Sequence, residues 1–88
     1  MKPTKTLIKE FTNLLTSLNQ SNQIENFIYH RLHWYLDIMN RNQTNRHFIK
    51  YLMFDYFDIG QDARDVSLNP IDVLNSTIWN KIKNFILM

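Results

Sequence analysis

The sequence predicts an all-α protein, most simply a single-domain antiparallel four-helix bundle over residues 1–88. One glycine and two prolines are too few for the turns of an all-β fold, and 44% hydrophobic residues argue against disorder. Four segments place their apolar residues at helical spacing, and short polar links join them, which favours antiparallel neighbours. Three helices plus an irregular acidic segment are the close variant.

The first predicted helix covers residues 4–18. Its apolar residues recur at intervals of three and four, which places them on one helix face. They are Leu7, Ile8, Phe11, Leu14, Leu15 and Leu18. Lys2, Lys5 and Lys9 project from the opposite side, and we expect them to be a solvated back face.

The second predicted helix begins at Asn22, after a polar link, and continues to about residue 39. Glu25 follows Asn22 by three positions, an arrangement that resembles a capping box with asparagine as the cap. One broad apolar face contains Ile24, Phe27, Ile28, Leu32, Tyr35, Ile38 and Met39, with Trp34 and Leu36 at its edges. The opposite face contains Asn26, His30, His33 and Asp37.

Arg31 lies in the middle of the apolar face of this second helix. A buried charge is costly unless an opposite charge compensates it. We therefore predict that the guanidinium of Arg31 contacts a carboxylate, and the candidates are Glu10, Asp55 and Asp58.

The third predicted helix begins near Arg46, after a polar link over residues 40–45, and ends near Gly60. Gly60 is the only glycine and is therefore the natural left-handed C-cap. The core face of this helix contains Phe48, Ile49, Leu52, Met53 and Tyr56. Tyr51 and Phe54 lie outside that face, among acidic side chains.

The last predicted helix follows a loop that ends at Asn69. Asn69 as N-cap with Pro70 at the first helical position is a strong start pattern. The expected apolar face contains Ile71, Leu74, Ile78, Ile82, Phe85 and Ile86, with Trp79 at its margin.

Charge is distributed unevenly along the chain. The net charge of +2 divides into +4 for residues 1–50, −3 for residues 51–65 and +1 for residues 66–88. Carboxylates beside aromatic residues can bind a basic protein surface, although a solvated helix end and loop is the simpler alternative. The candidate partner-binding residues are Tyr51, Phe54, Asp55, Asp58, Asp62 and Asp65.

The sequence suggests no enzyme, metal site or cofactor site. The acidic run lacks the glycine and glutamate positions of a calcium-binding EF-hand loop. His30 and His33 are spaced for two ligands of one metal ion, but neither His47 nor a cysteine supplies a clear third ligand. A single glycine leaves no nucleophile elbow and no phosphate-binding loop.

Two rival partners fit other features. Arg41, Asn45, Arg46 and Lys50 cluster within residues 41–50, which could bind nucleic acid or a nucleic-acid enzyme. A homodimer could instead form through Tyr29, Phe54 or Trp34. The absence of cysteine, of a signal-peptide pattern and of a membrane-spanning run predicts a cytoplasmic protein.

The second half of the chain combines three patterns. An aromatic-rich helix comes first, an acidic stretch with an arginine comes second, and Pro70-Ile71-Asp72 then opens a terminal amphipathic helix. The first two patterns contain Phe48, Tyr51, Phe54, Tyr56, Phe57, Asp58, Asp62, Arg64 and Asp65. In this order of patterns the chain resembles the small all-helical immunity proteins of the colicin D type, which also accompany contact-dependent growth-inhibition toxins.

The resemblance implies a stoichiometric inhibitor that occupies the catalytic cleft of a basic toxin domain, such as a nuclease. Members of that family are usually acidic overall, whereas this chain has a net charge of +2. The resemblance therefore implies a local acidic face that contacts the toxin, and not mimicry of nucleic acid by the whole protein.

Overall fold

The computed structural model describes residues 3–41 and 58–87, and within these ranges it contains five α-helices and no strand. The helices are α1 (Thr4–Thr16), α2 (Gln23–Arg41), α4 (Asp58–Asp65), α5 (Pro70–Leu74) and α6 (Thr77–Leu87). The predicted all-α class is confirmed. The four-helix bundle stays a prediction, because most of its third helix falls in residues 42–57, outside the described ranges.

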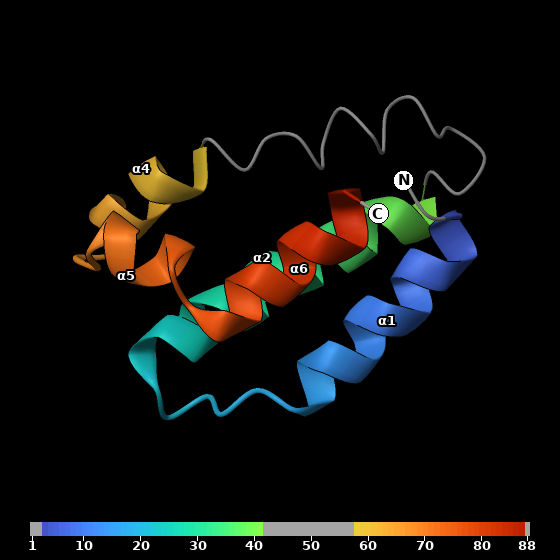
Figure 1. Cartoon of the computed structure of the whole chain (residues 1–88), viewed down its shortest axis with the longest axis horizontal. Helices are drawn as coiled ribbons and strands as arrows, with labels where there is room; N and C mark the ends of the chain where they lie inside the picture. The colour runs from blue at the N-terminus through green and yellow to red at the C-terminus, as the bar shows by residue number, and fades with distance from the viewer. Residues whose placement is uncertain (1–2, 42–57, 88) are drawn as a thin grey trace.

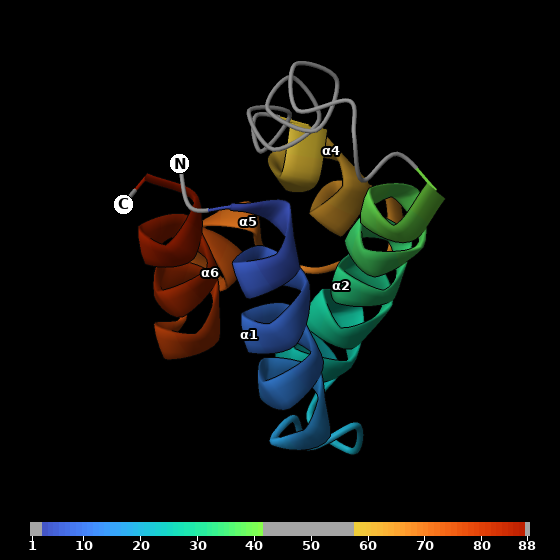
Figure 2. The same ribbon diagram turned by 90° about the vertical axis from the view of Figure 1, so that its right-hand side faces the viewer.

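Helices α1, α2 and α6 pack against one another and form what we call the three-helix layer (Figure 1). Residues 58–74, which comprise α4, α5 and the loop between them, form an arm that continues directly into α6. The beginning of α1 and the end of α6 lie side by side in both views (Figures 1 and 2). None of the helices in the described ranges has the length and apolar character needed to cross a bilayer.

The core runs through the three-helix layer and extends into the arm. Phe11 of α1 lies at its centre, with ring centroids 6.5 Å from Tyr35 of α2 and 6.0 Å from Phe85 of α6. The other buried apolar residues are Leu7, Leu14, Ile28, Leu32, Leu36, Met39, Ile59, Ala63, Val73, Trp79 and Ile82. These positions confirm the predicted apolar faces of the first two helices, and Lys5 and Lys9 are exposed as expected.

The start of α2 follows the predicted capping pattern with one variation. The Oδ1 atom of Asn22 accepts hydrogen bonds from the backbone N–H groups of Ile24 (3.0 Å) and Glu25 (3.1 Å). The Oε1 atom of Glu25 reaches further back than in a standard capping box and accepts from the N–H of Asn19 (3.3 Å). Asn22 is therefore the N-cap, and the carboxylate of Glu25 ties the preceding link to the helix.

The predicted last helix is in fact two helices, because the chain turns at Asn75 and Ser76. Asn69 caps α5 as predicted, with its Oδ1 accepting from the N–H of Ile71 at 2.9 Å. Five residues later α5 ends, and the hydroxyl of Ser76 accepts from the N–H of Trp79 at 3.2 Å to cap α6.

This break changes which side chains are buried in the last segment. Ile71 and Leu74, predicted to lie on the apolar face, are 65% and 38% exposed. Val73 is fully buried instead, and Trp79, predicted at the margin, is 1% exposed. A continuous helical periodicity cannot describe two helices that point in different directions, so the predicted face was wrong for α5.

Gly60 does not end a helix, which corrects a second prediction. It lies inside α4, and its φ is not positive. The left-handed residue is Ser67, with φ of 64°. The N–H of Leu68 donates to the carbonyl of Ala63 (2.8 Å) and the N–H of Ser67 to that of Arg64 (3.0 Å), the two hydrogen bonds of a Schellman motif. Residues 61–65, which the sequence placed in the loop after Gly60, are therefore helical.

Candidate functional site

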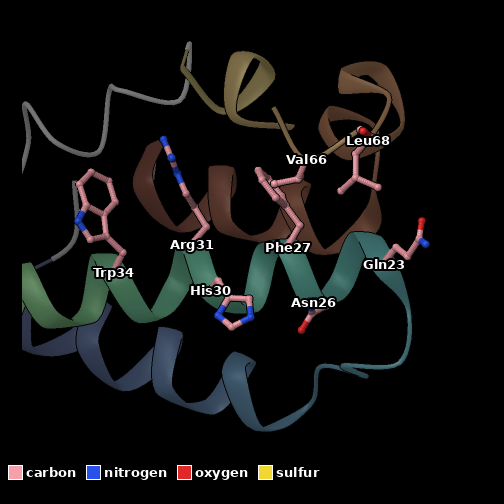
Figure 3. Close-up of a pocket in the computed structure, with 9 residues that line it drawn as sticks. Gln23, Asn26, Phe27, His30, Arg31, Trp34, Val66 and Leu68 are labelled. Carbon is pink, nitrogen blue, oxygen red and sulfur yellow. The ribbon is translucent and has the colours of Figure 1, made fainter. Parts of the chain in front are cut away.

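A groove of about 560 Å³ lies between one side of α2 and the loop that joins α4 to α5 (Figure 3). This volume is within the range of small-ligand pockets in proteins. Side chains from α2 form one wall and the loop forms the other. The lining residues are Gln23, Asn26, Phe27, His30, Arg31, Trp34, Val66, Ser67 and Leu68.

The apolar part of the groove comes from both walls. Phe27 and Trp34 project from α2 on either side of Arg31, and Val66 and Leu68 of the loop lie near the Phe27 end (Figure 3). Trp34 is 42% exposed and Val66 is 58% exposed. Large apolar side chains that line a hollow while remaining accessible to solvent are a recognised feature of binding surfaces.

Arg31 lies in the groove wall between Phe27 and Trp34 (Figure 3). Its Nη1 atom forms an ion pair with Oδ2 of Asp62 on α4, and its Nε atom donates to the hydroxyl of Tyr35 at 3.2 Å. The guanidinium carbon lies 5.2 Å from the ring centroid of Trp34 and 5.5 Å from that of Tyr35, within the range of cation–π contacts. The charge is therefore compensated by a carboxylate and by two rings.

The prediction that Arg31 contacts a carboxylate is confirmed by its ion pair with Asp62, which was not among the candidates. Of those candidates, Asp55 and the side chain of Asp58 lie outside the described residues. Asp62 had been placed in a loop beyond the end of the third helix. Because α4 continues through Gly60, Asp62 is carried on a helix whose residues Ile59 and Ala63 are buried in the core. The carboxylate therefore reaches the side of α2.

The environment of Arg31 affects its pKa in two opposing ways. Burial lowers the pKa, whereas the Tyr35 hydroxyl and the Asp62 carboxylate raise it, and the net effect is a raised pKa. Arg31 is therefore a fixed positive charge at any pH at which the protein is handled. Its side chain is only 10% exposed, whereas that of Asp62 is 45% exposed, so the more accessible member of the pair is the negative one.

The predicted partner-binding residues divide into three groups. Tyr51, Phe54 and Asp55 lie outside the described residues, and Asp58 opens α4 with a side chain that is also outside the description. Asp62 is paired with Arg31, which lines the groove. Asp65 is exposed in the last turn of α4, and its Oδ1 accepts a hydrogen bond from Nε2 of Gln61 at 3.1 Å. Three of the six residues therefore lie on α4, and the side chains of two of them, Asp62 and Asp65, are described.

A second, more polar hollow of about 530 Å³ adjoins the groove around the start of α2 and the start of α5. The two hollows share Gln23, Ser67 and Leu68, and Asp72 lines the second one. The arm that borders both hollows contains four aspartates and one arginine, a formal charge of −3. The arm that forms one wall of the groove is therefore negatively charged overall.

The histidines and the basic stretch show different arrangements. His30 and His33 are exposed and contact the Tyr29 ring edge-on, at centroid distances of 5.6 and 4.7 Å. Within residues 3–41 and 58–87, no group of three or more potential ligands is placed to hold a metal ion. Of residues 41–50 only Arg41 is described, and its Nη2 atom lies 3.1 Å from Oδ2 of Asp37.

The groove itself was not predicted from the sequence. Phe27 and Trp34 were assigned to the broad apolar face and its edge, although together with Arg31 they form a stripe at i, i+4 and i+7. That stripe is the sequence pattern from which the α2 wall of the groove could have been predicted. Its opposing wall depends on the loop conformation at Ser67, which local sequence does not specify.

No protein-family model, no curated protein and no solved structure matches this chain. The resemblance to immunity proteins of the colicin D type stays a prediction based on residue pattern.

Proposed function

We propose that this chain is a cytoplasmic immunity protein, a stoichiometric inhibitor that binds a basic toxin domain through the arm and the groove beside it. The observation that carries the proposal is the position of the solvent-accessible Trp34 and Val66 next to the carboxylates of α4. Aromatic anchors surrounded by charged groups are the arrangement in which small interfaces concentrate their affinity.

The charge distribution supports a basic partner. The arm has a formal charge of −3 in a chain whose net charge is +2, so the negative charge is local and directional. Such a patch speeds association with a positive surface, and this effect weakens as salt screens the charges. A nuclease domain, whose active site binds phosphates through lysine and arginine, is a partner of suitable charge.

Growth protection tests this proposal directly. The toxin domain encoded next to the gene is expressed from an inducible promoter, with and without this chain, and survival is counted. We expect survival only when both proteins are present, and a 1:1 complex in size-exclusion chromatography with light scattering. A toxin domain that kills equally in both strains and forms no complex would contradict the proposal.

A charge-matched pair of variants identifies the face that binds. Asp65→Asn on α4 and Asn13→Lys on the exposed side of α1 each raise the net charge by one. We expect Asp65→Asn to weaken binding by about two- to fivefold at low salt, because exposed ion pairs contribute about 0.2–1 kcal/mol. Asn13→Lys should leave the affinity unchanged. Equal effects of the two variants would show that only net charge matters.

The alternative function, binding of nucleic acid through the basic residues 41–50, predicts a different experimental result. If that stretch binds nucleic acid, a gel shift with duplex DNA or RNA should show an affinity that falls with salt and is lost in the Arg46→Gln, Lys50→Gln double variant. This outcome, without protection against the toxin domain, would replace the inhibitor proposal.

A further inference from the structure

The groove has a chemical preference that can be inferred from its walls. Its volume of about 560 Å³ exceeds that of any single side chain, and Phe27, Trp34, Val66 and Leu68 supply apolar contacts. One side of the Trp34 ring is in contact with the Arg31 guanidinium, yet the residue remains 42% exposed. An aromatic guest can therefore pack against the accessible side of Trp34, and the apolar residues Phe27, Val66 and Leu68 continue the groove beyond Arg31 (Figure 3).

The charged groups select the sign of the guest. Arg31 is the positive group in the groove wall, and it is 10% exposed and already in contact with Asp62, Tyr35 and Trp34. The carboxylate of Asp62 is 45% exposed, and those of Asp65 and Asp72 belong to exposed residues of the arm. These carboxylates lie outside the groove lining, on the arm that borders it. A cationic group that extends from the groove meets them, whereas an anionic group meets the same carboxylates and an arginine that is already paired with Asp62.

We propose that the groove binds an aromatic side chain of a partner protein, carried next to a lysine or arginine, with the ring against Trp34 and the cation at the carboxylates of the arm. The inference rests on the proposed function and deepens it, since it specifies the segment of the partner that the groove accepts. A basic nuclease surface contains the cations that such a segment needs.

Three small probes separate the two parts of this recognition. Phenethylamine carries a ring and a cation, 3-phenylpropionate carries a ring and an anion, and butylamine carries a cation without a ring. Each is titrated into the ¹⁵N-labelled full chain and followed by ¹H–¹⁵N correlation spectra. The indole N–H of Trp34 reports on the groove, and that of Trp79, which is 1% exposed, is the internal control.

Phenethylamine should shift the Trp34 indole signal and the backbone signals of residues 66–68 in a saturable manner, with a dissociation constant of about millimolar. Phenylpropionate should bind at least about fivefold more weakly than phenethylamine, and butylamine should leave the indole signal in place. Trp34→Ala should remove the binding. Trp34→Leu, which keeps an apolar side chain, should weaken it and provides a second test if the alanine variant misfolds.

Two further variants test the charge and the location. Asp65→Asn should reduce the preference for the amine over the acid, and Ile71→Ala, which removes an exposed apolar side chain of α5 outside the groove lining, should change nothing. Equal affinity for amine and acid would overturn the proposal. Absence of saturable binding, the result expected if another part of this chain fills the groove, would also overturn it. So would a concentration-dependent dimer that covers Trp34.

The inference and the proposed function fail separately. If the groove binds phenethylamine as described but the toxin domain is not neutralised, the proposed function is wrong and the ligand preference stands. If a complex with the toxin domain forms and Trp34→Ala leaves the affinity unchanged, the proposed inhibitor function stands and the groove does not contact the toxin domain.

Discussion

The three-helix layer and the arm are held in place by different interactions. In the layer, Phe11 contacts rings of both neighbouring helices, and Trp79 and Ile82 of α6 are almost fully buried. The arm contributes only Ile59, Ala63 and Val73 as buried apolar residues. The ion pair between Asp62 and Arg31 also joins it to α2.

This difference implies a division of roles. Fully burying a large apolar side chain stabilises a fold by about 1.5–3 kcal/mol, so the layer contains most of the apolar stabilisation of the described protein. The arm contains four of the eight acidic residues of the chain instead. Segments with few buried apolar contacts open locally at lower free energy than the core, and binding surfaces are often found among them. Four predictions test whether the arm and the layer are separable in this way.

The largest effect is expected for Phe11→Ala, which removes the ring at the centre of the layer. Large-to-small replacement of a buried phenylalanine costs about 3–5 kcal/mol, because it loses buried apolar area and leaves a cavity. Urea denaturation followed by circular dichroism should show a strong loss of stability or a protein that is unfolded without denaturant. Asn13→Ala, on the exposed side of the same helix, is the control and should differ little from the parent.

A smaller and more local effect is expected for Asp62→Asn. The substitution removes the Asp62 carboxylate from the Arg31 guanidinium, at a cost of about 1–3 kcal/mol, because Asp62 is only partly buried. Hydrogen exchange measured by mass spectrometry should show that the variant exchanges faster than the parent in α4, with a smaller change in α1.

The solvent-exposed pair of Asp37 with Arg41 provides the comparison for this result. Asp37→Asn should cost about 0.5 kcal/mol or less. If both variants lose the same stability and α4 keeps its protection, the ion pair does not hold the arm.

Two cap substitutions compare the regions with the same chemistry. Asn22→Ala removes the cap of α2 in the layer, and Asn69→Ala removes the cap of α5 in the arm. Each loses hydrogen bonds worth about 1 kcal/mol to the helix start. We expect Asn22→Ala to lower the global free energy of unfolding, and Asn69→Ala to reduce exchange protection mainly within residues 58–74. Identical protection patterns would mean that the arm and the layer unfold as one unit.

The smallest effect, and one of opposite sign, is expected for Gly60→Ala. Gly60 is inside α4, and an added Cβ would meet the Cβ of Pro70 at 3.7 Å, an ordinary contact. Alanine should therefore stabilise the protein by about 0.5–1 kcal/mol and raise the melting temperature by about 2–8 °C. A destabilised variant would indicate the left-handed cap that the sequence suggested.

The sequence predicted the layer better than the arm, for physical reasons. The starts of α2 and α5 are determined by local chemistry, because an asparagine cap bonds to its own next turn, and both were located correctly. The break before α6 was missed because the residue three positions after Ser76 is Trp79. A capping box needs a glutamate or glutamine at that position. The end of α4 was missed because Ser67 adopts a conformation that the single glycine was expected to supply.

The candidate site depended on these missed features. Arg31 could be predicted to contact a carboxylate, since the cost of an isolated buried charge is independent of the fold. Which carboxylate it contacts depends on where α4 ends and how the loop at Ser67 returns, and these are tertiary properties. For the same reason the stripe of Phe27, Arg31 and Trp34 could be read from the sequence, whereas the opposite wall at Val66 could not.

The position of Asp62 has a thermodynamic consequence. The Asp62 carboxylate pairs with Arg31 and is also 45% exposed to solvent, so an arriving cation competes with the protein's own arginine for it. By linkage, the free energy that a partner gains by binding this carboxylate is reduced by the free energy of the ion pair with Arg31 that it replaces. A cation that binds Asp65 instead would leave the arm fully attached.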